Sequence, residues 1–428
     1  MTAVTGAVIV TTMTFCGIVP PHILTRIADS GLHVAEAARR TLLTDMRHRF
    51  ARSAVPWVGE RHLPPPADVA ERLDDRAIFD DDDTENLPGS EVRAEGAAPT
   101  GDPCADEAYD GLGATFDFYL SVYDRWSVDG QGLPLKGTVH YGVQYDNAFW
   151  NGSQMVFGDG DGAVFSRFTC AVDVIGHELT HGVTQYTANL VYRGQSGALN
   201  ESVSDVFGSM VKQYRLGQDA ADADWLIGAG LFRPSVHGVA LRSMKDPGTA
   251  YDDPDIGKDP QPSTMAGYVD TADDDGGVHI NSGIPNRAFY LAATGIGGKS
   301  WEGAGRVWYD ARRREAVRAQ VGAGEGGGRG VAPGRGAGAQ VIRSPSAPEL
   351  PNIGGDEYRD PRAGSGAPGD PADAAAGVPG GRHRRRPDAR AADRGLPGLE
   401  RRAAVHSPSR LRDGLRRRPA GRLRLPEP

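Results

Sequence analysis

The stretch His177-Glu178-Leu179-Thr180-His181 places two histidines four residues apart, with a glutamate directly after the first. On a helix, side chains at this spacing project from the same face, so both imidazoles can bind one metal ion. Glu178 would lie beside that ion, where its carboxylate can act as a base for the attacking water. The spacing therefore predicts a helix that carries part of a metal-dependent hydrolytic site.

A second polar cluster, Asn200-Glu201-Ser202-Val203-Ser204-Asp205, follows later in the chain. Catalytic zinc takes three protein ligands and keeps one position open, and Glu201 would complete a set with His177 and His181. If this segment is also helical, Asp205 can accept a hydrogen bond from a ligand imidazole and fix its tautomer. The five-residue motif alone arises by chance in long proteins, and a structural zinc site would be richer in Cys. The two clusters together favour catalytic zinc.

Both clusters closely resemble the zinc-binding segments of thermolysin and its relatives, the neutral zinc endopeptidases. The resemblance covers about Ala77 to Tyr309 and is carried by several segments in family order. The further segments are Asn147-Ala148-Phe149-Trp150-Asn151-Gly152, Gly197-Ala198-Leu199-Asn200-Glu201, Leu241-Arg242-Ser243-Met244 and Gly277-Val278-His279-Ile280-Asn281-Ser282-Gly283. The resemblance implies an α+β fold with a strand-rich lobe (77–170), a helical lobe (171–309) and a zinc cleft between them. The active-site helix would run over about 169–190.

The resemblance also implies roles for individual catalytic residues. Tyr192 and His279 would stabilise the oxyanion of the tetrahedral intermediate, and Arg242 would hold a substrate carbonyl. Asp274 would orient the imidazole of His279 and favour its charged form. Zinc and two side-chain donors would together meet the charge that peptide hydrolysis builds on the carbonyl oxygen.

Four further residues would bind the substrate, again by resemblance. Asn147 and Ala148 would hydrogen-bond the peptide backbone, which would lie against them as an added strand. Val174 and Leu241 would help to line an apolar pocket for the residue after the scissile bond. The family likeness therefore predicts cleavage on the amino side of bulky hydrophobic residues.

Calcium sites of the family are not expected in this chain. A calcium ion takes six to eight oxygen ligands, and the paired-calcium site of relatives requires a cluster of carboxylates. Asp173 and Asp224 remain here, but the other matching positions are Lys212, Leu226 and Ala229. An ammonium group at that site opposes a cation. We therefore expect zinc as the metal and no paired-calcium site.

The N-terminal stretch Cys16-Gly17-Ile18-Val19-Pro20-Pro21-His22-Ile23-Leu24 resembles the short prosegment of protealysin-type relatives, in which a Pro-Pro motif lies in an inhibitory leader. Apolar residues at helical spacing predict a helix over about 32–50. We expect residues 1–70 to form a short prosegment that covers the cleft, with cleavage between about Arg52 and Ala77. Cys16 would either contact the zinc in this precursor or serve as a small buried hydrophobe, the usual fate of a lone Cys.

The sequence changes character after Tyr309. Residues 310–428 contain 24 Arg, no Lys, 14 acidic residues and a single aromatic, Tyr358. Such a composition buries too little apolar surface to order itself, so we expect a disordered Arg/Gly/Pro-rich tail and an incomplete helical lobe. The abrupt switch inside a matching segment also suggests a frameshift near Asp310.

Composition limits the remaining possibilities. The chain has a net charge of −9 and three cysteines, too few for a disulfide framework. It has no apolar run of membrane-spanning length, and residues 1–19 do not support a signal peptide. We expect a secreted monomer, with a cytoplasmic location as the alternative, that binds peptide or protein substrates and its own prosegment. The acidic peptidase region argues against a specific nucleic-acid partner.

These patterns predict a zinc-dependent neutral endopeptidase made as a zymogen. The alternative is a catalytically inert zinc-binding remnant with a disordered basic tail. The two hypotheses share an intact set of site residues and differ in whether the lobes assemble around it.

Overall fold

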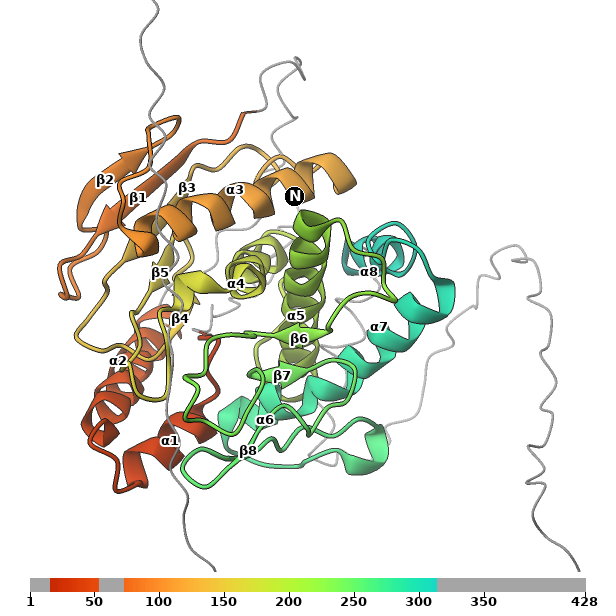
Figure 1. Ribbon diagram of the computed structural model, residues 1–428. Helices are drawn as coiled ribbons and strands as arrows, with labels where there is room; N and C mark the ends of the chain where they lie inside the picture. The colour runs from red at the N-terminus through yellow and green to blue at the C-terminus, as the bar shows by residue number, and fades with distance from the viewer. Residues whose placement is uncertain (1–15, 54–72, 314–428) are drawn as a thin grey trace, which may run out of the picture. The chain divides into compact units, whose positions relative to one another are not determined.

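The structure is a computed structural model that describes residues 16–53 and 73–313 (Figure 1). Most of the predicted cleavage region before Ala77 lies outside the described residues, and so does nearly all of the predicted tail. The described chain forms two N-terminal helices, a lobe that contains a five-stranded sheet, and a lobe built mainly from helices.

The segment expected to be the prosegment contains helices α1 (Pro21–Asp29) and α2 (Ala35–Ser53), which pack against each other. Pro21 suits the first turn of α1 because its missing N–H would have no partner there. The helix expected over 32–50 is present as α2, and two of its apolar residues at helical spacing, Ala38 and Leu42, pack in the core. Met46 is 59% exposed, whereas Thr44 and Asp45 are each 4% exposed and face the sheet-containing lobe.

One mixed sheet in the order β2-β1-β3-β5-β4 forms the first lobe. Its strands are β1 (Arg76–Asp80), β2 (Ser90–Ala94), β3 (Leu135–Val139), β4 (Ala148–Trp150) and β5 (Met155–Phe157). The central pairs β1–β3 and β3–β5 are parallel, and the outer pairs are antiparallel. Strand β4 is therefore an edge strand, and one of its sides is available to another segment of chain.

Helix α3 (Pro103–Tyr123) packs on β1 and β3. Asp102 caps its first turn by accepting hydrogen bonds from the backbone N–H groups of Cys104 and Ala105. The chain leaves the helix through Asp124 in the left-handed conformation. The sequence pattern predicted a strand-rich region here and gave no clear sign of α3, because the buried face of this helix includes small and polar residues as well as large apolar ones.

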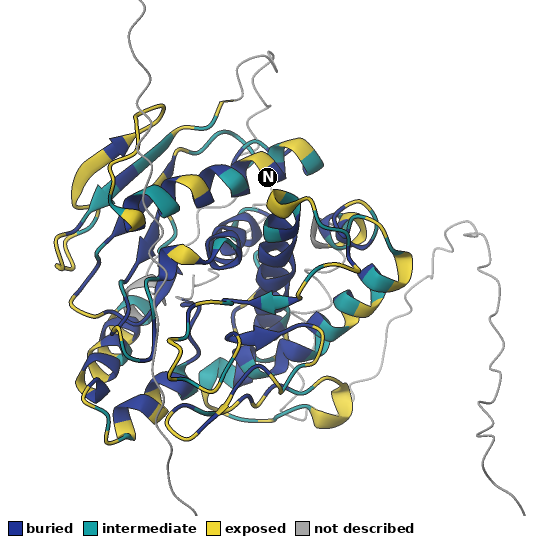
Figure 2. Cartoon of the chain, in the orientation of Figure 1, coloured by how far each residue is buried: buried dark blue, intermediate teal, exposed yellow. Residues whose placement is uncertain are grey.

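Helices α4 (Val172–Gln185) and α5 (Gly194–Leu216) form the centre of the molecule and are almost entirely buried (Figure 2). A short 3-10 turn, Phe168–Cys170, precedes α4, so the helix is shorter than the predicted 169–190. The two helices pack closely at glycines. A Cβ atom on Gly208 would lie 2.3 Å from the carbonyl oxygen of Asp173.

The remainder of the second lobe begins with a long irregular region rather than continuous helix. It contains the short strands β6 (Leu226–Ile227), β7 (Arg242–Ser243), β8 (Asp252–Asp253) and β9 (Gly257–Lys258), and a 3-10 turn at Met265–Gly267. Helices α6 (Asp274–Asn281), α7 (Gly283–Ile296) and α8 (Ala304–Arg313) follow. Helices α6 and α7 both pack against α5.

Within the two described segments, none of the helices combines the length and hydropathy that crossing a membrane requires.

Candidate active site and metal centre

Helix α4 presents two buried histidines to the interior of the site. The Nε2 atoms of His177 and His181 lie 3.0 Å apart. Nδ1 of His177 is 2.8 Å from Oδ1 of Asp205, and Nδ1 of His181 is 3.0 Å from Oδ1 of Asn200. Carboxylate and amide oxygens only accept hydrogen bonds, so each Nδ1 carries the proton and each Nε2 keeps its lone pair.

Glu201 reaches the same point from α5. Its Oε1 lies 3.4 Å from Nε2 of His181, and its Oε2 lies 3.5 Å from Nε2 of His177. Oε2 is buried and accepts no hydrogen bond from the described residues. Burial alone would raise the pKa of Glu201, but His279 and the two histidines of α4 lower it to about 2. The carboxylate is therefore ionised at neutral pH.

This donor set fits a zinc ion. Two imidazole lone pairs and a carboxylate directed at one point repel one another, and a cation between them removes that repulsion. Two nitrogens and one oxygen are ligands that zinc accepts in catalytic sites. His177, His181 and Glu201, with the sulfur of Cys16, offer atoms that all lie within 4.8 Å of one another. The structure thus brings the three predicted ligands together.

Glu178 follows the first ligand on α4 and is fully buried. Its Oε2 accepts a hydrogen bond of 3.0 Å from the backbone N–H of Trp150. Because Trp150 belongs to the edge strand β4, this contact holds the carboxylate between the metal ligands and the side of the sheet that a peptide would join.

Asp205 links the metal ligands to Arg242. The guanidinium donates two hydrogen bonds of 2.8 Å to the carboxylate, whose other contacts are His177 and the side-chain amide of Asn286. Burial would raise the pKa of Asp205, but Arg242 and His177 hold it well below its usual range. The contact between Asp205 and an imidazole was predicted from helical spacing, whereas no sequence pattern pointed to Asn286.

His279 and Tyr192 face the ligands from the other side. Nδ1 of His279 is 2.6 Å from Oδ1 of Asp274, as the resemblance implied. Burial would lower the pKa of His279, but Asp274 and Glu201 raise it above its ordinary value, which favours the charged imidazole. The hydroxyl of Tyr192 lies 3.3 Å from Nε2 of His279 and 2.6 Å from Oε1 of Glu201.

The prosegment occupies the edge of β4. The backbone N–H of Ile18 donates to the carbonyl of Ala148 at 3.0 Å, and the N–H of Val19 donates to Oδ1 of Asn147 at 2.9 Å. Arg242 donates to the carbonyl of Ile18 at 3.1 Å. The three residues expected to hold a peptide backbone therefore hold the leader.

A polar contact from α2 supports this arrangement. Asp45 accepts hydrogen bonds from the side-chain amide of Asn147 at 2.9 Å and from the hydroxyl of Tyr145 at 2.5 Å. Asp45 could not be predicted from the sequence, because one acidic residue in a polar helix gives no signal of burial.

Val174 and Leu241 are buried in the main apolar core together with Ile18 and Val19. The two residues predicted to line a specificity pocket thus share an apolar cluster with the leader that crosses the site.

Lys212 occupies the position that argued against paired calcium. Its ammonium lies 3.1 Å from Oδ2 of Asp173 and 2.8 Å from Oδ2 of Asp224. The two carboxylates that remain from the family pattern are therefore paired with a cation that belongs to the chain.

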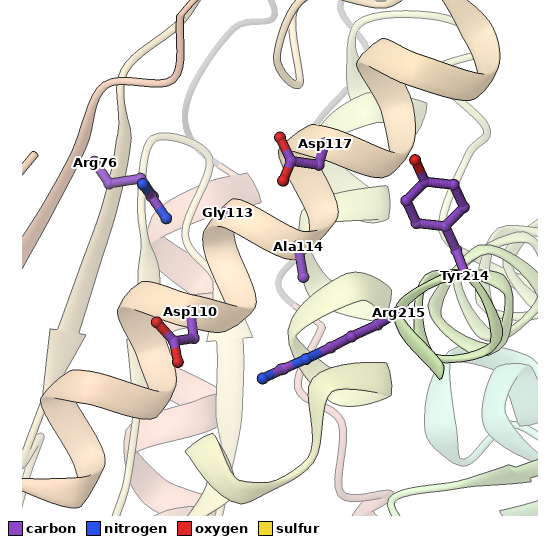
Figure 3. A pocket seen from close by; sticks show the side chains of 7 residues that line it. All are labelled: Arg76, Asp110, Gly113, Ala114, Asp117, Tyr214 and Arg215. Carbon is purple, nitrogen blue, oxygen red and sulfur yellow. The ribbon is translucent and has the colours of Figure 1, made fainter. Parts of the chain in front are cut away.

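A surface hollow of about 300 Å³ lies apart from these residues (Figure 3). It is lined by residues of β1, α3 and the end of α5: Arg76, Asp110, Gly113, Ala114, Asp117, Tyr214 and Arg215. These lining residues include no histidine or cysteine, and the hollow carries no part of the predicted chemistry.

Comparison with known proteins agrees with this geometry. Two family models match the chain: the thermolysin metallopeptidase catalytic domain over residues 78–185, and the thermolysin metallopeptidase alpha-helical domain over residues 188–320. The chain is 56% identical over 296 residues to an extracellular metalloprotease of Pectobacterium carotovorum subsp. carotovorum, which covers 69% of this chain and 83% of that protein.

Two further relatives point to the branch of the family. Protease PrtS of Photorhabdus sp. is 46% identical over 304 residues, covering 69% of this chain and 80% of that protein. The solved structure of the precursor of protealysin, a metalloproteinase from Serratia proteamaculans, is 52% identical with a TM-score of 0.63 and covers 70% of this chain and 87% of that one. With its prosegment in the cleft, the chain belongs to the thermolysin metallopeptidase family and is a metalloprotease of the protealysin type.

Proposed function

We propose that this zinc-dependent neutral endopeptidase is made as a zymogen and cleaves peptide bonds on the amino side of bulky hydrophobic residues. The observation that carries the proposal is the convergence of His177, His181 and Glu201 beside an edge strand that already holds a peptide backbone. The comparisons support the active enzyme, and nothing in the site favours the inert remnant.

Zinc, when bound by these three residues, would polarise the scissile carbonyl and make a water molecule more acidic. The residues of the chain supply the remaining steps. Glu178 takes a proton from the attacking water and delivers it to the leaving amine. Its contact with the N–H of Trp150 keeps the carboxylate next to the bound backbone.

Tyr192 and His279 would stabilise the developing oxyanion, since both present donors to the same small space. Asp274 serves as a positioning residue, because it fixes the orientation of His279 and favours its charged form. Asp205 has the corresponding role for His177 and Arg242.

The leader shows how a substrate would lie. Asn147, Ala148 and Arg242 would hydrogen-bond the substrate through the same atoms that hydrogen-bond Ile18 and Val19 in this structure. Substrate and prosegment therefore exclude each other, which makes the leader an inhibitor until cleavage removes it. The apolar surroundings of Val174 and Leu241 support the preference for a bulky hydrophobic residue after the scissile bond.

The first test compares the mature chain with its Glu178→Gln variant on a blocked Gly-Leu dipeptide amide, after an added protease has removed the prosegment from both proteins, because the variant lacks the base for self-processing. Loss of the general base should lower kcat by about 10²–10⁴-fold, whereas the zinc content should stay at one ion per chain. Glu91→Gln is the control, since Glu91 lies exposed on β2. Chelation of zinc should abolish turnover by the parent. Unchanged turnover by Glu178→Gln would assign the activity to a contaminant.

A casein digest tests the preference. Mass spectrometry should find new amino termini at Leu, Phe, Ile and Val. Cuts confined to the carboxyl side of basic residues would contradict the proposed pocket.

The remaining features of the enzyme are part of the same proposal. We expect it to need no paired calcium, because Lys212 already neutralises Asp173 and Asp224. Unfolding in the presence of a calcium-selective chelator should therefore match unfolding in added calcium. The names of its relatives support secretion, and we expect a monomer that acts on peptide or protein substrates.

A further inference from the structure

One side chain of the prosegment reaches the metal centre itself. Sγ of Cys16 lies 2.8 Å from Oε1 of Glu201, 2.8 Å from the hydroxyl of Tyr192 and 3.6 Å from Nε2 of His279. The residue is 4% exposed, and its apolar neighbourhood consists of Tyr192 and Val278. A cysteine that serves only as a small hydrophobe would be surrounded by apolar atoms, whereas this sulfur faces a carboxylate.

The four donor atoms lie close enough together to bind one metal ion. Around tetrahedral zinc with bonds of about 2.0–2.3 Å, ligand atoms are separated by roughly 3.3–3.8 Å. The separations of His177, His181 and Glu201 from one another run from 3.0 to 3.5 Å. The sulfur of Cys16 lies within 4.8 Å of all three donor atoms. A fourth donor atom is therefore within reach of the ion that the three ligands would bind.

The neighbouring backbone holds the sulfur in this place. Gly17 pairs with Phe149 of the edge strand, and a Cβ atom on Gly17 would lie 2.5 Å from the side-chain amide of Asn147. The hydrogen bonds of Ile18 and Val19 fix the next two residues. Each of the three residues after Cys16 is therefore held against β4 or Asn147, and these contacts fix the position of Cys16.

We propose that the thiolate of Cys16 is the fourth zinc ligand of the precursor and closes the coordination position that catalysis requires. The inference rests on the proposed function, because it assumes that His177, His181 and Glu201 bind zinc. When the zinc–sulfur bond forms, the thiol loses its proton to solvent. When the prosegment leaves, that bond breaks, water takes the vacated position, and the thiolate regains a proton.

This coordination adds a second block to the steric one. The leader covers the backbone-binding residues Asn147 and Ala148, and Cys16 occupies the metal. Both blocks belong to one segment upstream of the predicted cleavage region, so removal of the prosegment lifts them together.

Zinc X-ray absorption of the full chain tests the coordination directly. The Glu178→Gln background keeps the precursor intact, since it removes the base needed for self-processing. The parent in this background should show one sulfur at about 2.3 Å and three nitrogen or oxygen atoms at about 2.0–2.1 Å. Cys16→Ser should lose the sulfur and release zinc to a chelator about tenfold faster or more.

Cys104→Ser is the matched control. Cys104 is also buried, and with Asp102 and His140 it forms the second group of described residues that could hold a metal. Its replacement should leave the sulfur signal unchanged. Cys16→Ala is a second variant in case the serine disturbs folding, and cobalt substitution adds an independent readout, since only a thiolate ligand gives a sulfur-to-cobalt charge-transfer band.

The outcomes separate the two proposals. Bound zinc with only nitrogen and oxygen ligands in the parent would overturn the role of Cys16 and leave the endopeptidase proposal standing. A sulfur signal that persists in Cys16→Ser but disappears in Cys104→Ser would place the metal at the second group and overturn both. A chain that binds no zinc would also overturn both.

Discussion

Asp205 has two buried partners: it accepts a hydrogen bond from the imidazole of His177 and neutralises the guanidinium of Arg242. Neither Asp205 nor Arg242 is more than 1% exposed. A buried ion pair gives little net stability, but removal of one partner leaves the other charge uncompensated. Asp205 therefore matters more to the folded state than its one contact with a ligand suggests.

Asp205→Asn should lower the free energy of unfolding by about 3–5 kcal/mol, because Arg242 remains buried without a counter-charge. It should also weaken zinc binding by about 10–100-fold, because His177 loses the partner that fixes its tautomer. Denaturant unfolding and competition with a chelator measure the two effects. Asp252→Asn is the control, since Asp252 pairs with Lys258 on the surface and should change stability by less than about 1 kcal/mol. Equal losses in both variants would contradict the argument.

Residues of the site differ in how far the sequence could predict them. His177, His181 and Glu201 follow from helical spacing and the needs of zinc, and their roles need no tertiary information. Asp45, Asn286 and Asn200 act through contacts between distant segments, and their residue types are common on surfaces. Only the fold brings them to the site.

At the scale of elements, the distance between α4 and α5 sets the distance between the ligands. Gly208 permits this approach, because a Cβ atom there would lie 2.3 Å from the carbonyl of Asp173 and 3.0 Å from the N–H nitrogen of His177. Those neighbours are backbone atoms, which cannot move aside as a flexible side chain can.

Gly208→Ala should therefore push α5 away from α4. We expect a loss of about 1–3 kcal/mol in stability, as for overpacking in general, and weaker zinc binding. Gly295→Ala is the matched control, since this residue lies in α7 with no heavy atom within 4 Å of an added Cβ. It should raise stability by about 0.5–1 kcal/mol. Thermal unfolding with and without zinc would measure both the change in stability and the change in zinc binding. Equal effects at the two positions would contradict the packing argument.

Ion pairs at the first turn of α3 should make the stability of the fold depend on pH. His140 lies between Asp102, the cap of that helix, and Asp159, at 2.9 and 2.7 Å. Burial would lower the pKa of His140, but hydrogen bonds to Asp159 and Asp102 raise it to about 9. The pKa of His140 is therefore higher in the folded state than its value of about 6.5 in the unfolded state. The ion pairs of His140 contribute their full stability below about pH 6.5, and this stability is lost as pH rises to about 9.

Solvent screens this partly exposed group, so we expect a loss of about 1–2 kcal/mol across that interval. Urea unfolding at intervals from pH 6 to 9 measures it. The slope should become shallower in His140→Gln, which keeps a polar side chain but does not titrate; Asp146, whose pKa burial raises to about 8, accounts for part of the remaining slope. A slope that is the same in both proteins would show that other groups are responsible.

On the scale of the whole molecule, α7 and α8 expose apolar side chains. Leu291, Ile296 and Val307 are 54%, 62% and 60% exposed. The sequence predicted an incomplete helical lobe from the loss of family likeness after Tyr309, and these side chains lie near the end of that likeness. Composition could indicate where the pattern stops, but not which side chains would remain exposed.

Replacement of Leu291, Ile296 and Val307 by Lys should reduce any self-association at high concentration, because exposed apolar side chains promote contacts between copies. Light scattering and binding of a hydrophobic dye would both fall, while zinc content stays constant. Replacement of Lys245, Lys258 and Lys299 by Arg provides a control with the same number of changes. A variant that scatters light as strongly as the parent would mean that this face does not drive association.

The edge of β4 has a consequence for how such an enzyme can evolve. The atoms of Asn147, Ala148 and Arg242 that would grip a substrate are the ones that grip the leader. A change that tightens the hold on one peptide backbone tightens the hold on the other. Lineages selected for greater affinity would therefore mature more slowly, unless compensating changes accumulate in the leader. A mutation at these residues that changes the affinity for substrate should therefore also change the rate at which the precursor is activated.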